Sequence, residues 1–161
     1  MKKLFTVMCA ISAVSVLAAD FKLPAKHFKV ISGGKSEIVR GEEFFSRAIR
    51  LEAAKERAVT AALPHGGFFN FIPAVYEVKA EIKGQGTAFL EIQLLTADNK
   101  IIGQHRVVTR QATARFRDIE GKLDLRDKTF AQPPFKVNVV IGVEQGGEVT
   151  FDDIELDIDN D

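Results

Sequence analysis

Arginine is the side chain in this sequence best suited to holding a ligand, because a guanidinium group offers a planar fork of donors that matches carboxylates and sulfates. Four arginines gather around one predicted loop: Arg106, Arg110, Arg115 and Arg117. By strand parity Arg115 and Arg117 share a face, and Arg106 lies on the neighbouring strand. The group either binds an anionic polysaccharide or pairs with Glu and Asp residues of adjacent strands. We take Arg106, Arg115 and Arg117 as candidate ligand-binding residues.

Other residue types that carry catalysis are present without the spacing that catalysis needs. The histidines are far apart and none has a second ligand at metal-binding spacing: His27, His65 and His105. No serine lies in a nucleophile elbow. Gly84-Gln85-Gly86 begins no predicted helix, so it is a turn and not a phosphate loop. A glycosidase needs two carboxylates held at a defined separation, and the sequence indicates no such pair. We therefore predict that the protein is not an enzyme.

The elements that position these side chains are predicted to be strands. The clearest stretch runs from Pro73 to Thr96, where two runs of alternating apolar and polar residues flank Gly84-Gln85-Gly86. Successive side chains on a strand point to opposite faces, so each run predicts a half-buried strand with its charges in water. A glycine-rich turn between two such runs predicts an antiparallel hairpin. Tyr76 falls on the apolar side of the first run, and we expect it in the core.

A second hairpin is predicted near the C-terminus, where alternating residues 137–143 are followed by Gln145-Gly146-Gly147 and a return strand. The return strand changes parity: Val149 and Phe151 are odd-numbered, whereas its later apolar residues are Ile154, Leu156 and Ile158. A shift of one residue is what a β-bulge produces, so we predict a bulge at Asp152-Asp153. The acidic residues beyond it then face away from the core, which discourages aggregation at a sheet edge.

Residues 42–63 support two alternatives. Their Ala, Glu, Arg and Leu content favours a helix. In the competing interpretation Phe45, Ile49 and Leu51 lie on one side of a strand, Ala53-Ala54-Lys55 turns, and a second strand returns. We prefer the strands because of the resemblance described below.

The remaining segments are also short and extended. Strands are predicted over 27–31, 36–40, 101–108, 113–116 and 119–125, with polar or proline-containing turns between them. Short strands separated by turn signals at intervals of ~8–12 residues indicate an all-β sandwich or barrel of antiparallel sheets.

The N-terminal residues are typical of a secretory signal peptide. A basic start at Lys2-Lys3 is followed by an apolar run from Leu4 to Leu17 and then by Ala18-Ala19. The run is short of the ~20 residues that a membrane span needs. We predict a signal peptide over residues 1–19, one mature domain over 20–161, and a secreted or periplasmic location. The single cysteine, Cys9, lies inside the predicted signal peptide, so the mature domain is expected to fold without a disulfide.

Charge balance excludes some partners. Without Lys2 and Lys3 the chain has 20 basic residues against 22 acidic ones. General nucleic-acid binding needs a basic excess, so we predict no nucleic-acid partner and no membrane span in the mature chain.

From Arg47 to Asp157 the sequence resembles the jelly-roll carbohydrate-binding modules of bacterial glycoside hydrolases and the wider galactose-binding-like superfamily. The matching segments, in chain order, are 48–52, 73–80, 89–92, Phe116 with 121–123, and the ending Gly147-Glu148-Val149-Thr150-Phe151-Asp152-Asp153-Ile154-Glu155-Leu156. The resemblance implies an antiparallel β-sandwich with jelly-roll topology, which is one of the architectures that manages exposed sheet edges.

The resemblance also implies a ligand site on a sheet face or at the loop tips, and a structural calcium ion held in part by Asp152 and Asp153. Calcium takes six to eight oxygen ligands, of which two aspartates supply only a part. Sugar-binding modules commonly stack sugar rings on Trp or Tyr, but this chain has no Trp and one Tyr. Phe68 and Phe69, in a glycine-flanked segment, are the aromatic candidates for ligand contact; the alternative is that they pack in the core.

Together these observations predict a secreted, non-catalytic β-sandwich module that recognises carbohydrate or a cell-surface glycan. The alternative is a structural or protein-interaction sandwich of the bacterial envelope, with another envelope protein as its partner and no glycan ligand. Saturable binding to a polysaccharide would separate the two.

Overall fold

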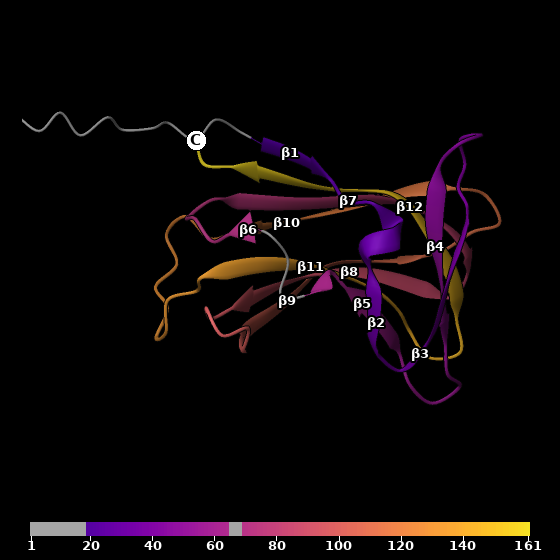
Figure 1. Cartoon of the computed structure of the whole chain (residues 1–161), viewed down its shortest axis with the longest axis horizontal. Coiled ribbons are helices and arrows are strands. Elements are labelled where there is room, and N and C mark those ends of the chain that lie inside the picture. The colour runs from indigo at the N-terminus through magenta and orange to yellow at the C-terminus, as the bar shows by residue number, and fades with distance from the viewer. Residues whose placement is uncertain (1–18, 65–68) are drawn as a thin grey trace, which may run out of the picture.

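The computed structural model describes residues 19–64 and 69–161, which form two antiparallel sheets packed face to face (Figure 1). A short 3₁₀ helix, η1 (Ala25–His27), lies between the first two strands. The strands of the first sheet, sheet A, are β1 (Ala19–Lys22), β3 (Gly34–Arg40), β4 (Arg47–Ala53), β7 (Val75–Gln85), β10 (Arg117–Asp124) and β12 (Glu148–Asp159). Those of sheet B are β2 (Lys29–Ser32), β5 (Val59–Ala62), β6 (Phe69–Asn70), β8 (Thr87–Leu95), β9 (Ile101–Gln111) and β11 (Lys136–Val143).

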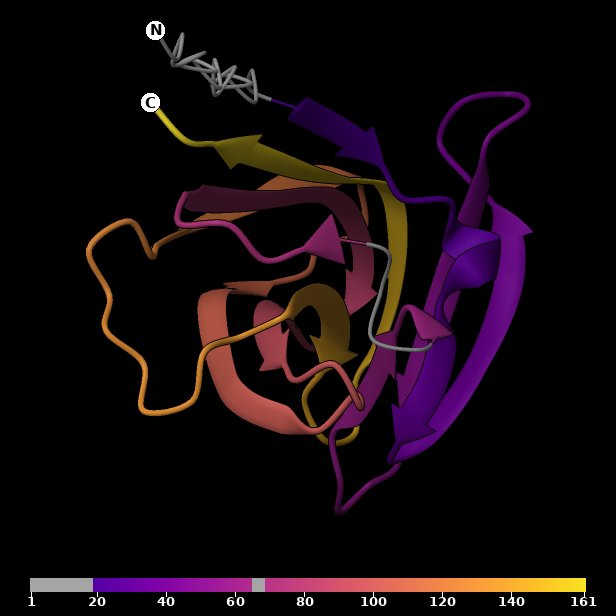
Figure 2. The same cartoon turned by 60° about the vertical axis from the view of Figure 1, so that its left-hand side comes forward.

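One of the last two strands of the chain lies at the centre of each sheet. In sheet A the order is β10-β7-β12-β4-β3, and β1 lies along the end of β12 (Figure 2). In sheet B the order is β2-β5-β11-β8-β9, with β6 beside β11. Consecutive strands therefore often belong to different sheets, as jelly-roll topology requires. The predicted all-β jelly-roll sandwich is confirmed.

Both predicted hairpins are wrong in their pairing. β7 lies in sheet A and β8 in sheet B, and the same holds for β12 and β11. The glycine turns carry the chain across from one sheet to the other. Gly84 and Gly86 adopt φ angles of 146° and 107°, which residues other than glycine rarely adopt. The amide of Gly84 donates to the carbonyl of Thr113 and not across a hairpin.

Several other predictions can be compared directly with the strands. Residues 42–63 contain the strands β4 and β5 and no helix, so the strand alternative is confirmed. The bulge is confirmed, since the register between β12 and β7 shifts between Asp152 and Glu155 and Asp153 has a φ of 46°. The strand predicted over 113–116 is wrong, because this segment is the connection between β9 and β10. The predicted signal peptide lies outside the described residues, apart from Ala19.

The core between the sheets consists of the inward-facing apolar residues. Its largest fully buried members are Tyr76, Phe151, Ile49, Leu51, Ile82, Leu90, Ile92, Leu94, Ile119, Ile141 and Leu156. Phe89 is also buried, but it belongs to the outer face of sheet B. The hydroxyl of Tyr76 donates to the carbonyl of Ile72 and accepts from its amide, at 2.6 and 3.0 Å. A buried tyrosine hydroxyl needs such partners, and here they fasten the segment that leads into β7.

Within the described residues, no helix has the length and apolar character needed to cross a membrane.

Candidate functional site

Ion pairs neutralise the charges at the two ends of the outer face of sheet A. The ammonium of Lys79 lies 2.6 Å from Asp157 and 3.5 Å from Glu77, and Lys122 lies 3.1 Å from Glu77. At the other end of the face Arg50 pairs with Glu37 and Glu148. Opposite charges on neighbouring strands stabilise a sheet by fractions of a kcal/mol per pair. We therefore assign these ion pairs to the stability of sheet A.

The outer face of sheet B carries polar side chains that are almost fully buried. Glu91, Gln93 and Asn138 are only 4%, 4% and 3% exposed. The register places Asn138 opposite Gln93 and Gln93 opposite Gln104, and Glu91 opposite Arg106. These five residues form what we call the polar row: Glu91, Gln93, Gln104, Arg106 and Asn138. The row crosses three neighbouring strands of sheet B, which are β11, β8 and β9.

Hydrogen bonds join one end of the polar row into a network. Gln104 Nε2 donates to Glu91 Oε2 at 2.6 Å, and Arg106 Nε donates to Glu91 Oε1 at 3.1 Å. Arg106 Nη1 also donates to Glu144 Oε1 at 2.5 Å. A buried carboxylate is stable when charged donors satisfy it, so Glu91 orients Arg106 and Gln104. The Arg106 side chain as a whole is 43% exposed to solvent.

An aromatic ring lies under this arginine. The Arg106 guanidinium carbon is 3.8 Å from the centroid of the Phe89 ring. Phe89 lies across the backbone of Gly142 on the neighbouring strand, and a Cβ atom at that position would come within 2.1 Å of the ring. Glycine is therefore needed for close approach of the ring, not for a special backbone angle.

Asn138 lies at the other end of the row, and its side-chain oxygen accepts no hydrogen bond from the described residues. Its amide nitrogen donates to the carbonyl of Leu63 at 3.2 Å. Its Oδ1 atom has no partner among the described residues. A buried acceptor without a donor costs free energy, so a group that offers a donor to it is stabilised.

The structure separates the predicted ligand-binding arginines. Arg106 belongs to the polar row. Arg115 lies in the loop between β9 and β10, and Arg117 begins β10 in sheet A. Arg110 connects the two sheets, because its guanidinium donates to the carbonyl of Asp118. The predicted grouping thus brings only Arg106 to the outer face of sheet B.

The aromatic candidates are also redistributed. Phe69 is buried and packs edge-to-face against Phe21, with ring centroids 4.8 Å apart. Phe68 lies outside the described residues. The most exposed aromatics among the described residues are instead Phe44 and Phe45, which are 70% and 90% exposed in the loop between β3 and β4. The strand interpretation puts Phe45 on the same side as Ile49 and Leu51, whereas the preceding Gly41-Glu42-Glu43 is the signal for a loop.

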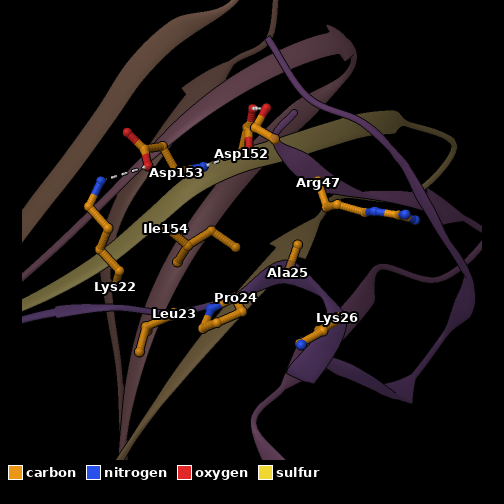
Figure 3. Close-up of a pocket in the computed structure, with 10 residues that line it drawn as sticks. Lys22, Leu23, Pro24, Ala25, Lys26, Arg47, Asp152, Asp153 and Ile154 are labelled. Atoms are coloured by element: carbon orange, nitrogen blue, oxygen red, sulfur yellow. Dashed lines mark hydrogen bonds and ion pairs between the residues drawn. The ribbon is translucent and has the colours of Figure 1, made fainter. Parts of the chain in front are cut away.

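The calcium ligands implied by the resemblance already have partners from the protein. Asp152 Oδ2 accepts from the amide of Glu42 at 2.8 Å and from the hydroxyl of Ser46 at 3.0 Å, and its Oδ1 accepts from the amide of Asp153. Figure 3 shows Lys22 reaching Asp153, with 3.3 Å between Nζ and Oδ1. No group of three or more His, Cys, Asp or Glu residues in 19–64 and 69–161 is placed to hold a metal ion. As folded, these residues do not fit calcium.

Carboxylates crowd the same region. Glu81 of β7 lies opposite Asp118 of β10 and Asp152 of β12, with no cation in that register. The pKa of Glu81 is raised to about 7. Partial burial is the main cause, followed by the charge and hydrogen bond of Glu42 and then by the negative charges of Asp153 and Asp118. Like charges directly opposite each other destabilise a sheet, so Glu81 carries a cost at neutral pH.

This cost predicts a pH-dependent effect of Glu81→Gln. A carboxyl group whose pKa is higher in the folded state favours folding at low pH, and that stability is lost as pH rises through the raised value. At pH 8 we expect the variant to be more stable than the wild type by about 1 kcal/mol, a figure reduced for solvent screening because the group is only partly buried. At pH 4 the advantage should vanish.

Urea unfolding at pH 4, 6 and 8 measures this. Glu120→Gln is the matched control, because Glu120 lies on the same face opposite Lys79 and has a compensating charge. An equal gain from Glu81→Gln at every pH would contradict the prediction.

No family model matches the sequence, and no curated protein matches it. Solved structures do match its fold. The family 22 xylan-binding domain of Xyn10C from Paenibacillus barcinonensis superposes with a TM-score of 0.61 at 11% identity, over 90% of this chain and 94% of that one. A family 29 carbohydrate-binding module from Piromyces equi gives 0.58 at 9% identity, over 87% and 90%.

A larger protein contains the same fold as one part. The module-containing xylanase 10B structure from Clostridium thermocellum, complexed with xylohexaose, gives a TM-score of 0.64 at 14% identity. This chain is covered over 91% of its length but spans only 28% of that xylanase chain. The chain therefore has the jelly-roll fold of carbohydrate-binding modules.

The same fold also occurs outside those modules. A cyclase from Fischerella sp. TAU gives a TM-score of 0.54 at 9% identity, over 87% of this chain and 88% of that one. Fold alone does not assign an activity, so the function must be argued from the site.

Proposed function

We propose that the protein is a secreted, non-catalytic carbohydrate-binding module whose ligand lies across the outer face of sheet B. The polar row carries this proposal. Its exposed members, Gln104 and Arg106, offer an amide and a guanidinium group, which supply donors and an acceptor to the hydroxyl groups of a sugar chain, and the buried Glu91 positions them. The fold shared with xylan-binding and other carbohydrate-binding modules supports it. The predicted signal peptide supports secretion.

The chemistry of the row favours hydrogen bonding over ring stacking. Phe89 is covered by Arg106, and the row contains no exposed aromatic ring. The positive charge of Arg106 is balanced by Glu91 and Glu144. We therefore propose a neutral polysaccharide as the ligand, in place of the anionic one that the arginines alone predict. The two carboxylates beside Arg106, those of Glu91 and Glu144, are both engaged by its guanidinium group, which supports a binding role for the row.

Affinity electrophoresis against soluble xylan, mixed-linkage β-glucan and polygalacturonate tests this proposal. We expect saturable retardation by a neutral polysaccharide. Arg106→Ala should weaken it at least about tenfold, because a hydrogen bond to a charged group contributes roughly 1.5–3 kcal/mol. Arg50→Ala is the matched control: Arg50 has a similar exposure of 40% and also pairs with two glutamates, but lies on sheet A.

An unchanged mobility in all three polysaccharides would contradict the proposal, as would equal effects of the two arginine variants. Tighter binding to polygalacturonate than to the neutral chains would restore the anionic alternative.

Phe44 and Phe45 favour a second candidate, a protein-contact role. Their rings meet edge-to-face with centroids 4.7 Å apart, and Arg40 lies 4.5 Å above Phe44. Exposed aromatic side chains together with arginine are common in protein interfaces. In the same electrophoresis assay a Phe44→Ser/Phe45→Ser variant should bind polysaccharide like the wild type, because this loop lies away from the polar row.

A further inference from the structure

The acidic bulge of β12 borders a cleft that is lined by one positively charged side chain and several carboxylates. The cleft has a volume of about 450 Å³ and is lined by Lys22, Glu42, Glu43, Ser46, Glu81, Asp152 and Asp153. Lys22 is the single cationic side chain among the described residues that line it. Five carboxylates and one ammonium group therefore share one surface recess.

The Lys22 ammonium group bridges the bulge. Its Nζ atom lies 3.3 Å from Asp153 Oδ1 and 3.2 Å from Glu155 Oε1. These two acidic residues flank the inward-pointing Ile154, so the ammonium group spans the irregular part of the strand. Lys22 comes from β1, which runs antiparallel to β12 and pairs Lys22 with Glu155. The geometry places a positive charge on Asp153, one of the two carboxylates that the implied calcium would use.

The other half of the acidic site is satisfied by neutral donors. Asp152 binds the amide of Glu42 and the hydroxyl of Ser46, and a Cβ atom on Gly41 would lie 2.1 Å from Asp152 Oδ2. The loop thus packs directly onto the carboxylate. A divalent ion at Asp152 would have to displace these donors.

We propose that Lys22 is a built-in counter-cation that replaces a divalent metal ion at the β12 bulge. The wild-type domain then reaches its full stability without calcium. Removal of Lys22 leaves Asp153, Glu155 and the neighbouring Glu81 and Glu42 without a positive charge in the cleft. Once the ammonium group is gone, rotation of these side chains from their present positions lets the same carboxylates, which are hard oxygen ligands, recruit a divalent ion from solution.

Thermal unfolding of Lys22→Met with and without CaCl₂ tests the proposal. In EDTA we expect its Tm to fall by about 2–4 °C, the size expected for an exposed ion pair in a domain of this length. Adding about 5 mM CaCl₂, above the dissociation constants of weak extracellular calcium sites, should restore at least half of that loss. The wild type should shift by less than about 1 °C under the same change, which is small beside an ordinary mutational shift.

Two controls separate a bound ion from simple screening. Lys100→Met removes an equally exposed ammonium, 77% against 76% for Lys22, which also lies near a carboxylate, Asp98 at 3.1 Å. It should show no recovery in CaCl₂. Sodium chloride at matched ionic strength should not rescue Lys22→Met, because screening acts on all exposed charges alike.

Two outcomes would overturn the proposal. One is a wild-type Tm that rises in CaCl₂ or falls in EDTA, since the domain would then hold calcium despite Lys22. The other is a Lys22→Met variant that loses stability but responds to CaCl₂ no more than Lys100→Met does. A direct calcium titration of both variants by calorimetry decides whether any recovery reflects binding at the bulge.

Discussion

Replacing Gly142 by alanine is expected to lower the free energy of unfolding by about 2 kcal/mol, the usual cost of forcing an extra group into a packed site. The added methyl group would lie 2.1 Å from the Phe89 ring, well inside van der Waals contact. The ring must turn away from β11, and Arg106, which stacks on it at 3.8 Å, must move with it or lose the contact. The proposed polysaccharide site should weaken along with stability.

A double-mutant cycle shows whether the ring is the cause. Phe89→Ala alone is expected to be strongly destabilising, by about 3 kcal/mol or more, because it removes a fully buried ring. If the clash with Phe89 explains the effect of Gly142→Ala, the alanine should cost much less in the Phe89→Ala background than in the wild type. Urea unfolding of the four proteins measures this. Additive effects would mean that Gly142 is needed for another reason.

The strands could be predicted from alternation, but their partners could not. In β7 and β8 the apolar and polar residues alternate as they would in either a hairpin or a crossing between sheets. A turn with Gly84 and Gly86 is compatible with both, because glycine adopts the required backbone angles in each case. The choice depends on β10, β11 and β12, which supply the hydrogen-bonding partners from far along the chain.

The polar row could be predicted only in part. Glu91 and Gln93 alternate with Leu90, Ile92 and Leu94, which correctly places them on the face away from the core. The sequence then predicts that they are solvated. The structure buries them, because β9 and β11 bring side chains against them from both sides. Burial on an outer sheet face depends on strand neighbours, which period-2 alternation does not specify.

The exposed Phe44 and Phe45 show that strand parity does not predict burial for residues in a loop. Ile49 and Leu51 are buried as their parity predicts, whereas Phe45, which shares it, lies two residues before β4 begins. Parity has meaning only where the backbone is extended, and the end of a strand is the least certain part of a sequence-based prediction. The bulge at Asp152-Asp153 was predictable because its apolar residues continue on both sides of the shift.

Asp152→Ala is expected to lower the free energy of unfolding by about 3 kcal/mol, since hydrogen bonds to a charged acceptor contribute roughly 1.5–3 kcal/mol and a buried donor left without a partner adds to the loss. Asp152 is buried and accepts from Glu42, Ser46 and Asp153. Asp157→Ala is the matched control on the same strand. It removes a partly exposed pair with Lys79 and should cost at most about 1 kcal/mol.

The loss should be concentrated in the loop between β3 and β4, which Asp152 holds against sheet A. Chymotrypsin cleaves after aromatic residues, and Phe44 and Phe45 at the tip of this loop are already exposed. With its anchor removed, the loop can open locally without global unfolding, so native-state cleavage there should become faster in Asp152→Ala than in Asp157→Ala. Equal cleavage rates in the two variants would mean that the backbone bond from Gly41 to Ser46 holds the loop by itself. A cleavage site that moves elsewhere in the chain would place the weakness outside the loop.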